Sequence, residues 1–142
     1  MKSKYQLFID SDVIISALLS NEGASYLLFR LANTTRLISN YSLKELVKVI
    51  NRLNISQKKL DLTTDKCSCI TISENLDKIK LKYQKYVKDI NDAHIISGAV
   101  KAKARYLITY NTKDYYSNLI KKDFNILIIT PGMFLQYLRS QN

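Results

Sequence analysis

Glycine, proline and cysteine are scarce in this 142-residue chain. Three glycines and one proline supply too few tight turns for an all-β sandwich or barrel, so helices are expected to make most connections. The two cysteines, Cys67 and Cys69, cannot form a disulfide framework and lack the second pair that a zinc site requires. A reducing cytoplasm is therefore the expected location. No run approaches the roughly 20 apolar residues of a membrane span, so no membrane partner is expected.

The length and composition predict one folded domain over residues 1–142. Hydrophobic residues make up 46% of the chain and charged residues 24%, close to the globular norm. The first residues, MKSKYQLFIDSDVIISALL, carry two lysines and then apolar residues, as a secretory signal does. Asp10 and Asp12 interrupt the apolar stretch and no small-residue cleavage site follows, so the signal interpretation is rejected.

Positive charge is in clear excess, with 22 Lys and Arg against 12 Asp and Glu and a formal net charge of +10. Such an excess favours a polyanionic partner such as nucleic acid, although a lysine-rich proteome has the same signature. The segment LDKIKLKYQKYVKD has no acid between Lys78 and Lys88. Lys78, Lys82 and Lys85 are its candidate nucleic-acid contacts, and an ordinary solvated helix face explains the segment equally well.

Short apolar segments alternate with segments of helical periodicity along the chain. Strands are expected at 5–10, 36–40, 105–109 and 125–130, with residues 70–73 either a brief strand or a connection. Helices are expected at 13–31 with a break at 21–23, and at 42–53, 56–69, 74–87, from 89–92 through 104, and at 132–140. This alternation predicts the α/β class, as a three-layer α/β/α sandwich with a central parallel sheet.

Four acids fall where strands end or the following helices begin. Asp10 ends the first strand, Glu45 lies in the first turn of the helix at 42–53, Asp92 opens a helix, and Asp114 follows the strand at 105–109 by one loop. Ligands of an open parallel sheet bind outside the carboxyl ends of its strands, so these carboxylates are expected to converge on one rim.

Each acid also has an ordinary explanation. Glu45 completes a capping box with Ser42, Asp92 caps a helix, and Asp114 stabilises a turn. Their joint placement favours a site, and clustered carboxylates need a divalent cation to stay ionised. Oxygen ligands favour Mg²⁺ or Mn²⁺, and a cation beside phosphate-binding lysines is the arrangement of a nuclease.

Several motifs, taken in order, resemble the PIN-domain family over nearly the whole chain. FIDSDVIISALLS at 8–20 is similar to the family's opening, and YSLKELVKVI at 41–50 resembles its second acidic motif. DINDAHIISGAVKAKARYLITYNTKDY at 89–115 is similar to its third and fourth motifs. The resemblance implies a metal-dependent endoribonuclease, resembling the VapC-like toxin of a toxin–antitoxin pair. It implies RNA as substrate, a small antitoxin that covers or enters the acidic cleft, and a homodimer as a common assembly.

Carried over residue by residue, the resemblance makes Asp10, Glu45, Asp92 and Asp114 the acids that hold Mg²⁺ or Mn²⁺. Thr109 matches a strand-end hydroxyl that orients a ligand or water. The chain departs from the family at two positions: Asn111 stands where many members have an acid, and Asp12 stands where Asn is common. Asp12 then either adds a compensating charge or caps the following helix.

Two questions stay open at this level. His94 lies about 200° round a helix from Asp92, so a structural role apart from the acids is expected. The departure at Asn111 keeps a rival function open, a nucleic-acid-binding module of the same fold with weak or no catalysis. A phosphoacceptor receiver domain is disfavoured because NILIITPG supplies no lysine after the strand, and no G-x-G-x-x-G exists for a dinucleotide.

Overall fold

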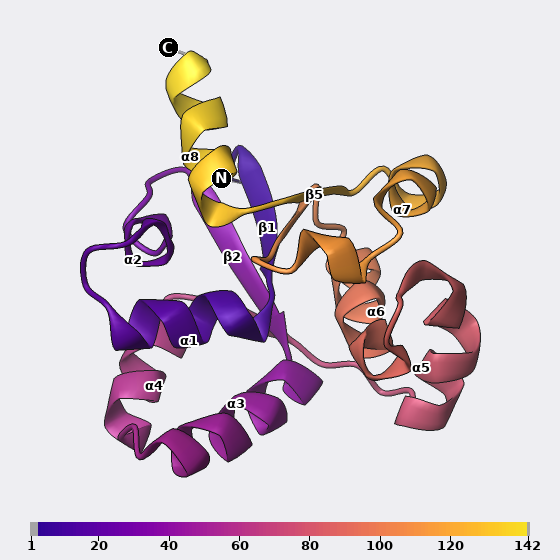
Figure 1. Ribbon diagram of the computed structural model, residues 1–142, viewed down its shortest axis with the longest axis horizontal. Helices are drawn as coiled ribbons and strands as arrows, with labels where there is room; N and C mark the ends of the chain where they lie inside the picture. Colours follow the sequence, from indigo (N-terminus) through magenta and orange to yellow (C-terminus); the bar gives the residue numbers. More distant parts are fainter. Residues whose placement is uncertain (1–2, 142) are drawn as a thin grey trace.

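The computed structural model describes residues 3–141 and has a parallel β-sheet between two layers of helices (Figure 1). Within these residues the sheet has five strands in the order β3-β2-β1-β4-β5, and every neighbouring pair is parallel. The strands are β1 (Tyr5–Ile9), β2 (Thr34–Ser39), β3 (Ser68–Ile70), β4 (Tyr106–Ile108) and β5 (Leu127–Ile129). The predicted three-layer α/β/α sandwich is confirmed.

Helices and single 3-10 turns connect the strands. The helices are α1 (Ser11–Leu19), α2 (Ala24–Leu28), α3 (Asn40–Leu53), α4 (Gln57–Thr64), α5 (Leu76–Tyr83), α6 (Ala93–Lys101), α7 (Ser117–Phe124) and α8 (Pro131–Ser140). The 3-10 turns are η1 (Gln84–Tyr86), η2 (Ile90–Asp92) and η3 (Thr112–Asp114). Over residues 3–141, no helix combines the length and apolar character that crossing a bilayer requires.

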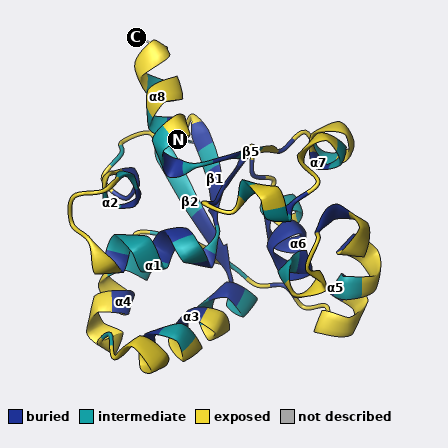
Figure 2. Ribbon diagram, viewed as in Figure 1, coloured by how far each residue is buried: buried dark blue, intermediate teal, exposed yellow. Residues whose placement is uncertain are grey.

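The central strand β1 divides its side chains between two hydrophobic cores, because successive strand residues point to opposite faces of the sheet. Leu7 and Ile9 pack with α1, α2, α3, α4 and α8 on one face. Phe8 packs with α5, α6 and α7 on the other. Both cores are dark in Figure 2, and β1 lies between them. Burial on both faces fixes β1 and therefore the position of Asp10, the residue that follows it.

The expected capping box at Ser42 and Glu45 is wrong. Helix α3 begins at Asn40, because the Ser39 side chain is its N-cap and accepts a hydrogen bond from the Ser42 amide at 3.1 Å. Glu45 therefore lies beyond the first turn. Its carboxylate is free of the capping role and contacts a different helix.

Four other segments differ from expectation. The helix expected at 56–69 ends at Thr64, and strand β3 begins at Ser68, earlier than the expected 70–73. The helix expected at 74–87 is α5 followed by the 3-10 turn η1. Helix α7 was not expected from the sequence. Tyr116 is its N-cap residue.

Candidate active site

Asp10 lies at the carboxyl end of β1 and is the N-cap of α1. Its Oδ1 accepts a hydrogen bond from the Ser11 amide at 2.7 Å. Its Oδ2 accepts one from the Thr109 hydroxyl at 2.9 Å and one from the Tyr115 hydroxyl at 2.8 Å. Burial raises the pKa of Asp10, the hydrogen bonds from Tyr115, Thr109 and Ser11 oppose the rise, and the charge of Glu45 adds to it. Asp10 is thus a buried carboxylate held by fixed donors.

Asp12 lies in the first turn of α1, beside Asp10. Its Oδ2 accepts hydrogen bonds from the Tyr110 amide and from the Asn111 side chain, each at 3.1 Å. Its Oδ1 is buried, and no donor among the described residues reaches it. Burial and then the charge of Asp10 raise the pKa of Asp12 to about 6. One oxygen of this carboxylate is therefore buried without a hydrogen-bond partner among residues 3–141.

Asp92 ends the turn η2 and precedes α6, and Asp114 ends the turn η3 after β4. Burial and, in order of decreasing effect, the charges of Asp10, Asp89, Asp114 and Glu45 together raise the pKa of Asp92 to about 6. Asp10, Glu45 and Asp114 belong to segments distant from Asp92 in the chain, and the fold brings their charges near enough to act on it. Their joint coordination of one cation stays a prediction.

Glu45 on α3 contacts His94 on α6. His94 Nε2 and Glu45 Oε2 are 3.0 Å apart, and the two side chains are 8% and 45% exposed. The hydrogen bond with His94 is the main reason that the pKa of Glu45 is lowered, against the effect of its own partial burial. His94 is buried, as a structural role implies. Its contact with Glu45 nevertheless joins it to a candidate site acid, which the sequence did not predict.

Tyr115 makes a contact with Asp10 that the sequence did not predict. It lies just after η3 and is buried, and burial and the charge of Asp10 raise its pKa, which keeps the hydroxyl protonated as a donor. The chain contains ten tyrosines. Only the antiparallel pairing of Tyr115 with Val87 and the approach of both segments to β1 distinguish this one.

The donor set has the chemistry that Mg²⁺ or Mn²⁺ prefers, since every acid supplies carboxylate oxygens. Within residues 3–141, no three Asp, Glu, His or Cys side chains stand ready to hold a cation. Hydroxyl donors occupy Asp10 Oδ2, whereas Asp12 Oδ1 is buried and has no hydrogen-bond partner among the described residues. The residues fit such a cation by donor type, and binding one requires their side chains to turn.

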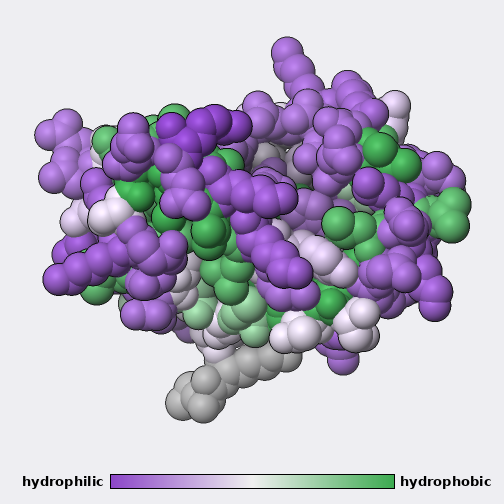
Figure 3. All heavy atoms as spheres, turned by 90° about the horizontal axis from the view of Figure 1, so that it is seen from below, coloured by the Kyte–Doolittle hydropathy of each residue, from purple (hydrophilic) through white to green (hydrophobic). Residues whose placement is uncertain are grey.

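Lysines border the acids on two sides. Lys44, Lys48 and Lys80 line a cavity together with Glu45 and His94. Lys85, Lys88 and Lys113 line another cavity, beside Tyr115. Lys78 and Lys82 are exposed on α5. Figure 3 shows a face of the molecule where hydrophilic side chains predominate over smaller apolar patches.

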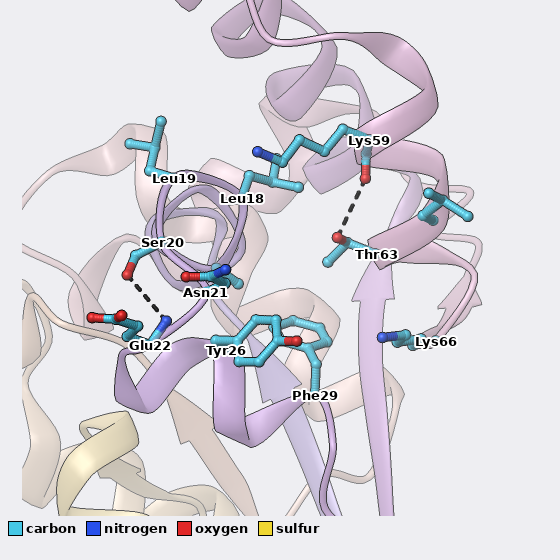
Figure 4. Close-up of a pocket in the computed structure, with 12 residues that line it drawn as sticks. Leu18, Leu19, Ser20, Asn21, Glu22, Tyr26, Phe29, Lys59, Thr63 and Lys66 are labelled. Atoms are coloured by element: carbon cyan, nitrogen blue, oxygen red, sulfur yellow. Dashed lines mark hydrogen bonds between the residues drawn. The ribbon is translucent and has the colours of Figure 1, made fainter.

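A further cavity opens between α1, α2 and α4 (Figure 4). Leu18, Leu19 and Phe29 supply apolar lining, and Lys59 and Lys66 add positive charge. None of the site residues expected from the sequence lines it. It is separate from the acid cluster.

Comparison with known proteins gives one family and a set of related folds. The PIN domain family matches residues 6–113. No curated protein sequence matches the chain significantly. VapBC2 from Rickettsia felis, solved with a DNA fragment from its promoter, is 21% identical, with a TM-score of 0.64 over 88% of this chain and 98% of that one.

Two further structures share the fold. A toxin–antitoxin complex from Klebsiella pneumoniae is 19% identical, with a TM-score of 0.66 over 88% of this chain and 97% of that one. VapC20 from Mycobacterium tuberculosis, a sarcin–ricin loop cleaving toxin, is 14% identical, with a TM-score of 0.53 over 71% and 86%. At these identities the likeness is one of fold.

Proposed function

Because the chain belongs to the PIN domain family, we propose that it is a metal-dependent endoribonuclease that hydrolyses RNA phosphodiesters. The observation that carries the proposal is the pair Asp10 and Asp12: Asp10 Oδ2 accepts hydrogen bonds from Thr109 at 2.9 Å and Tyr115 at 2.8 Å, and the buried Asp12 Oδ1 has no donor among residues 3–141. Buried carboxylates that repel one another are typical of a functional site, where a divalent cation offsets the repulsion.

In this proposal Asp10, Glu45, Asp92 and Asp114 hold Mg²⁺ or Mn²⁺. When bound, the cation supplies a water of lowered pKa and stabilises the leaving oxygen of the phosphodiester. Thr109 and Tyr115 orient Asp10 by donating to its Oδ2. Asn111 orients Asp12, which adds a carboxylate to the group.

The substrate is proposed to be RNA bound through its phosphates. The net charge of +10 and the lysines that border the acids favour a polyanion over a neutral ligand. Lys78, Lys82 and Lys85 remain the proposed contacts in the basic segment. Because the acids themselves repel phosphate, the lysines and the cation together make binding favourable.

We further propose that the protein is the toxin of a toxin–antitoxin pair that acts in the cytoplasm, with a homodimer as its assembly. The fold it shares with the Klebsiella pneumoniae toxin–antitoxin complex and with VapBC2 supports an antitoxin partner. A small antitoxin that covers or enters the acidic cleft would block both cation and RNA.

The test compares wild type with Asp10→Asn. Wild type is expected to cleave single-stranded RNA with Mn²⁺ and not with EDTA, and the variant to be inactive while its metal-free fold is about as stable, since the charge is buried. Mn²⁺ should raise the melting temperature of wild type in proportion to its concentration over its affinity. Equal stabilisation of both proteins, with cleavage intact in the variant, would contradict the proposal.

One observation supports a second candidate function, a nucleic-acid-binding module without efficient catalysis. Asn111 supplies an amide where an acid would add a ligand, and this amide occupies Asp12 Oδ2. Wild type that binds RNA in EDTA and fails to cleave it in Mn²⁺ would favour this alternative.

A further inference from the structure

A cavity of about 640 Å³ lies beside the acid cluster on the side of Tyr115. Lys85, Lys88 and Lys113 line it together with Tyr116. Its lining contains no Asp or Glu among the residues that the structure describes. The cavity is thus strongly positive and contains an aromatic ring, directly next to a group of carboxylates.

Backbone hydrogen bonds join two segments that line this cavity, residues 86–88 and 114–116. The Lys88 amide donates to the Asp114 carbonyl at 2.9 Å, and the Tyr116 amide donates to the Tyr86 carbonyl at 3.0 Å. Val87 and Tyr115 form the antiparallel bridge between these bonds. This pairing brings lysines from both segments to one cavity, so its charge is built into the backbone arrangement.

Tyr115 joins the cavity to the proposed catalytic acids. It lines the cavity, and its hydroxyl donates to Asp10 Oδ2 at 2.8 Å. Asp114, which adds to the acid cluster, lies between Lys113 and Tyr115 in the chain. Tyr115 therefore borders both the cavity and Asp10, which places the cavity next to the proposed catalytic acids.

Tyr116 gives the cavity a surface for a flat ring. Its side chain is 48% exposed, and the Lys88 ammonium lies 6.0 Å from the ring centroid. An exposed aromatic side chain beside lysines is the combination that binds single-stranded nucleic acid, in which bases stack and phosphates pair with cations. An acidic peptide would use the lysines and leave the ring without a role.

We propose that this cavity binds one nucleotide of a single-stranded RNA next to the phosphodiester that is cleaved. The base stacks on Tyr116, and Lys85, Lys88 and Lys113 contact the flanking phosphates. This inference rests on the proposed ribonuclease function. It deepens that function by assigning a subsite that favours single-stranded over double-stranded RNA.

The lysines are tested by the salt dependence of RNA binding. A fluorescent ten-nucleotide single-stranded RNA of random sequence is titrated in EDTA, which removes cleavage from the measurement. Each lost phosphate contact lowers the slope of log affinity against log salt by about 0.7, so Lys85→Gln/Lys88→Gln/Lys113→Gln is expected to lower it by about 2. The matched control, Lys58→Gln/Lys101→Gln/Lys122→Gln, removes the same charge from exposed lysines outside the cavity and is expected to change it by less than about 0.7.

The stacking surface is tested separately. Tyr116→Ala is expected to weaken RNA binding at least about fivefold, and Tyr116→Phe to retain wild-type affinity because the ring remains. An abasic oligomer with the same number of phosphates is expected to bind wild type and Tyr116→Ala equally. Melting temperatures within about 2 °C of wild type are expected for these exposed positions and separate lost contacts from lost fold.

The outcomes separate this inference from the nuclease proposal. If wild type does not cleave in Mn²⁺ while the variants lose RNA binding in EDTA as expected, the nuclease proposal fails and the cavity stands as a binding site for single-stranded RNA without a cleaved bond. If cleavage is normal and the cavity variants match the control, the subsite is overturned. It is also overturned if Tyr116→Ala binds RNA normally while the triple lysine variant loses binding to a fluorescent polyglutamate, because the cavity then takes an acidic peptide.

Discussion

The side-chain amide of Asn111 donates a hydrogen bond to Asp12, with Nδ2 and Oδ2 3.1 Å apart. PIN-domain proteins commonly have Asn at the position of Asp12, and many have an acid at the position of Asn111, so the two groups have exchanged places in this chain. The exchange keeps one carboxylate and one amide at this corner of the site. The Tyr110 amide, which also donates to Asp12 Oδ2, holds the carboxylate in its new position.

Reversing the exchange is the first test. Asn111→Asp replaces a donor with a second carboxylate against Asp12, and we expect it to lower the free energy of unfolding by about 1–3 kcal/mol in EDTA. The double variant Asp12→Asn/Asn111→Asp restores one amide and one carboxylate and should recover at least half of that loss. Urea unfolding of the four proteins in the cycle measures the coupling. Additive effects of the two substitutions would mean that the contact carries no energy.

Stability without metal should rise as the pH falls from about 7 toward 5. The folded-state pKa values of Asp12 and Asp92 are raised from 3.8 to about 6, so in this range the folded protein binds more protons than the unfolded chain. The free energy of unfolding therefore increases as protons are added, and this contribution is lost as the pH rises through about 6. Glu45, whose pKa is lowered, opposes this trend only at more acidic pH.

Urea unfolding in EDTA at pH 7.5, 6.5 and 5.5 checks this dependence. The double variant Asp12→Asn/Asp92→Asn is the control and should show a flatter profile, since it lacks both titrating groups. With Mn²⁺ present, stability should instead rise with pH, because protons compete with the cation for the same carboxylates. If the wild-type protein loses stability steadily from pH 7.5 to 5.5 in EDTA, the ionised acids do not destabilise the fold and the prediction is wrong.

The contact between His94 and Glu45 predicts a change in the pH dependence of cleavage. His94→Leu removes the hydrogen bond that lowers the pKa of Glu45, so the carboxylate protonates at higher pH. We expect the acidic limb of the pH–rate profile to move to higher pH, with the largest loss of rate below about pH 5 and little change at pH 8. His94→Gln keeps a donor and should lie between the two. An equal loss at every pH would point to a packing role for His94 alone.

The sequence predicted the layers of the fold, because the periodicity of strands and helices is a local signal. It misplaced the start of α3, since Ser39 and Ser42 are both plausible caps and only the register of β2 selects the former. Contacts made across the sheet left no local trace. His94 with Glu45 and Tyr115 with Asp10 join residues that are 49 and 105 positions apart, and no spacing rule connects such pairs.

The packing beneath the site supplies the last prediction. Gly98 of α6 lies against the ring of Phe8, and a Cβ at position 98 would stand 2.4 Å from the ring's Cζ. Phe8 is completely buried and cannot turn away freely, so Gly98→Ala should lower the free energy of unfolding by about 1–3 kcal/mol despite alanine's better helix propensity. Gly132→Ala is the matched control in α8, where a Cβ meets nothing within 4 Å, and it should be neutral or stabilise by up to about 1 kcal/mol.

The same substitution at Gly98 should also affect the site, because Phe8 of β1 is two residues before Asp10 in the chain. Gly98→Ala should therefore reduce cleavage at temperatures where the protein is fully folded. Phe8→Leu in the Gly98→Ala background makes room for the new methyl group, and a double variant no more stable than Gly98→Ala would show that the ring is not the source of the strain.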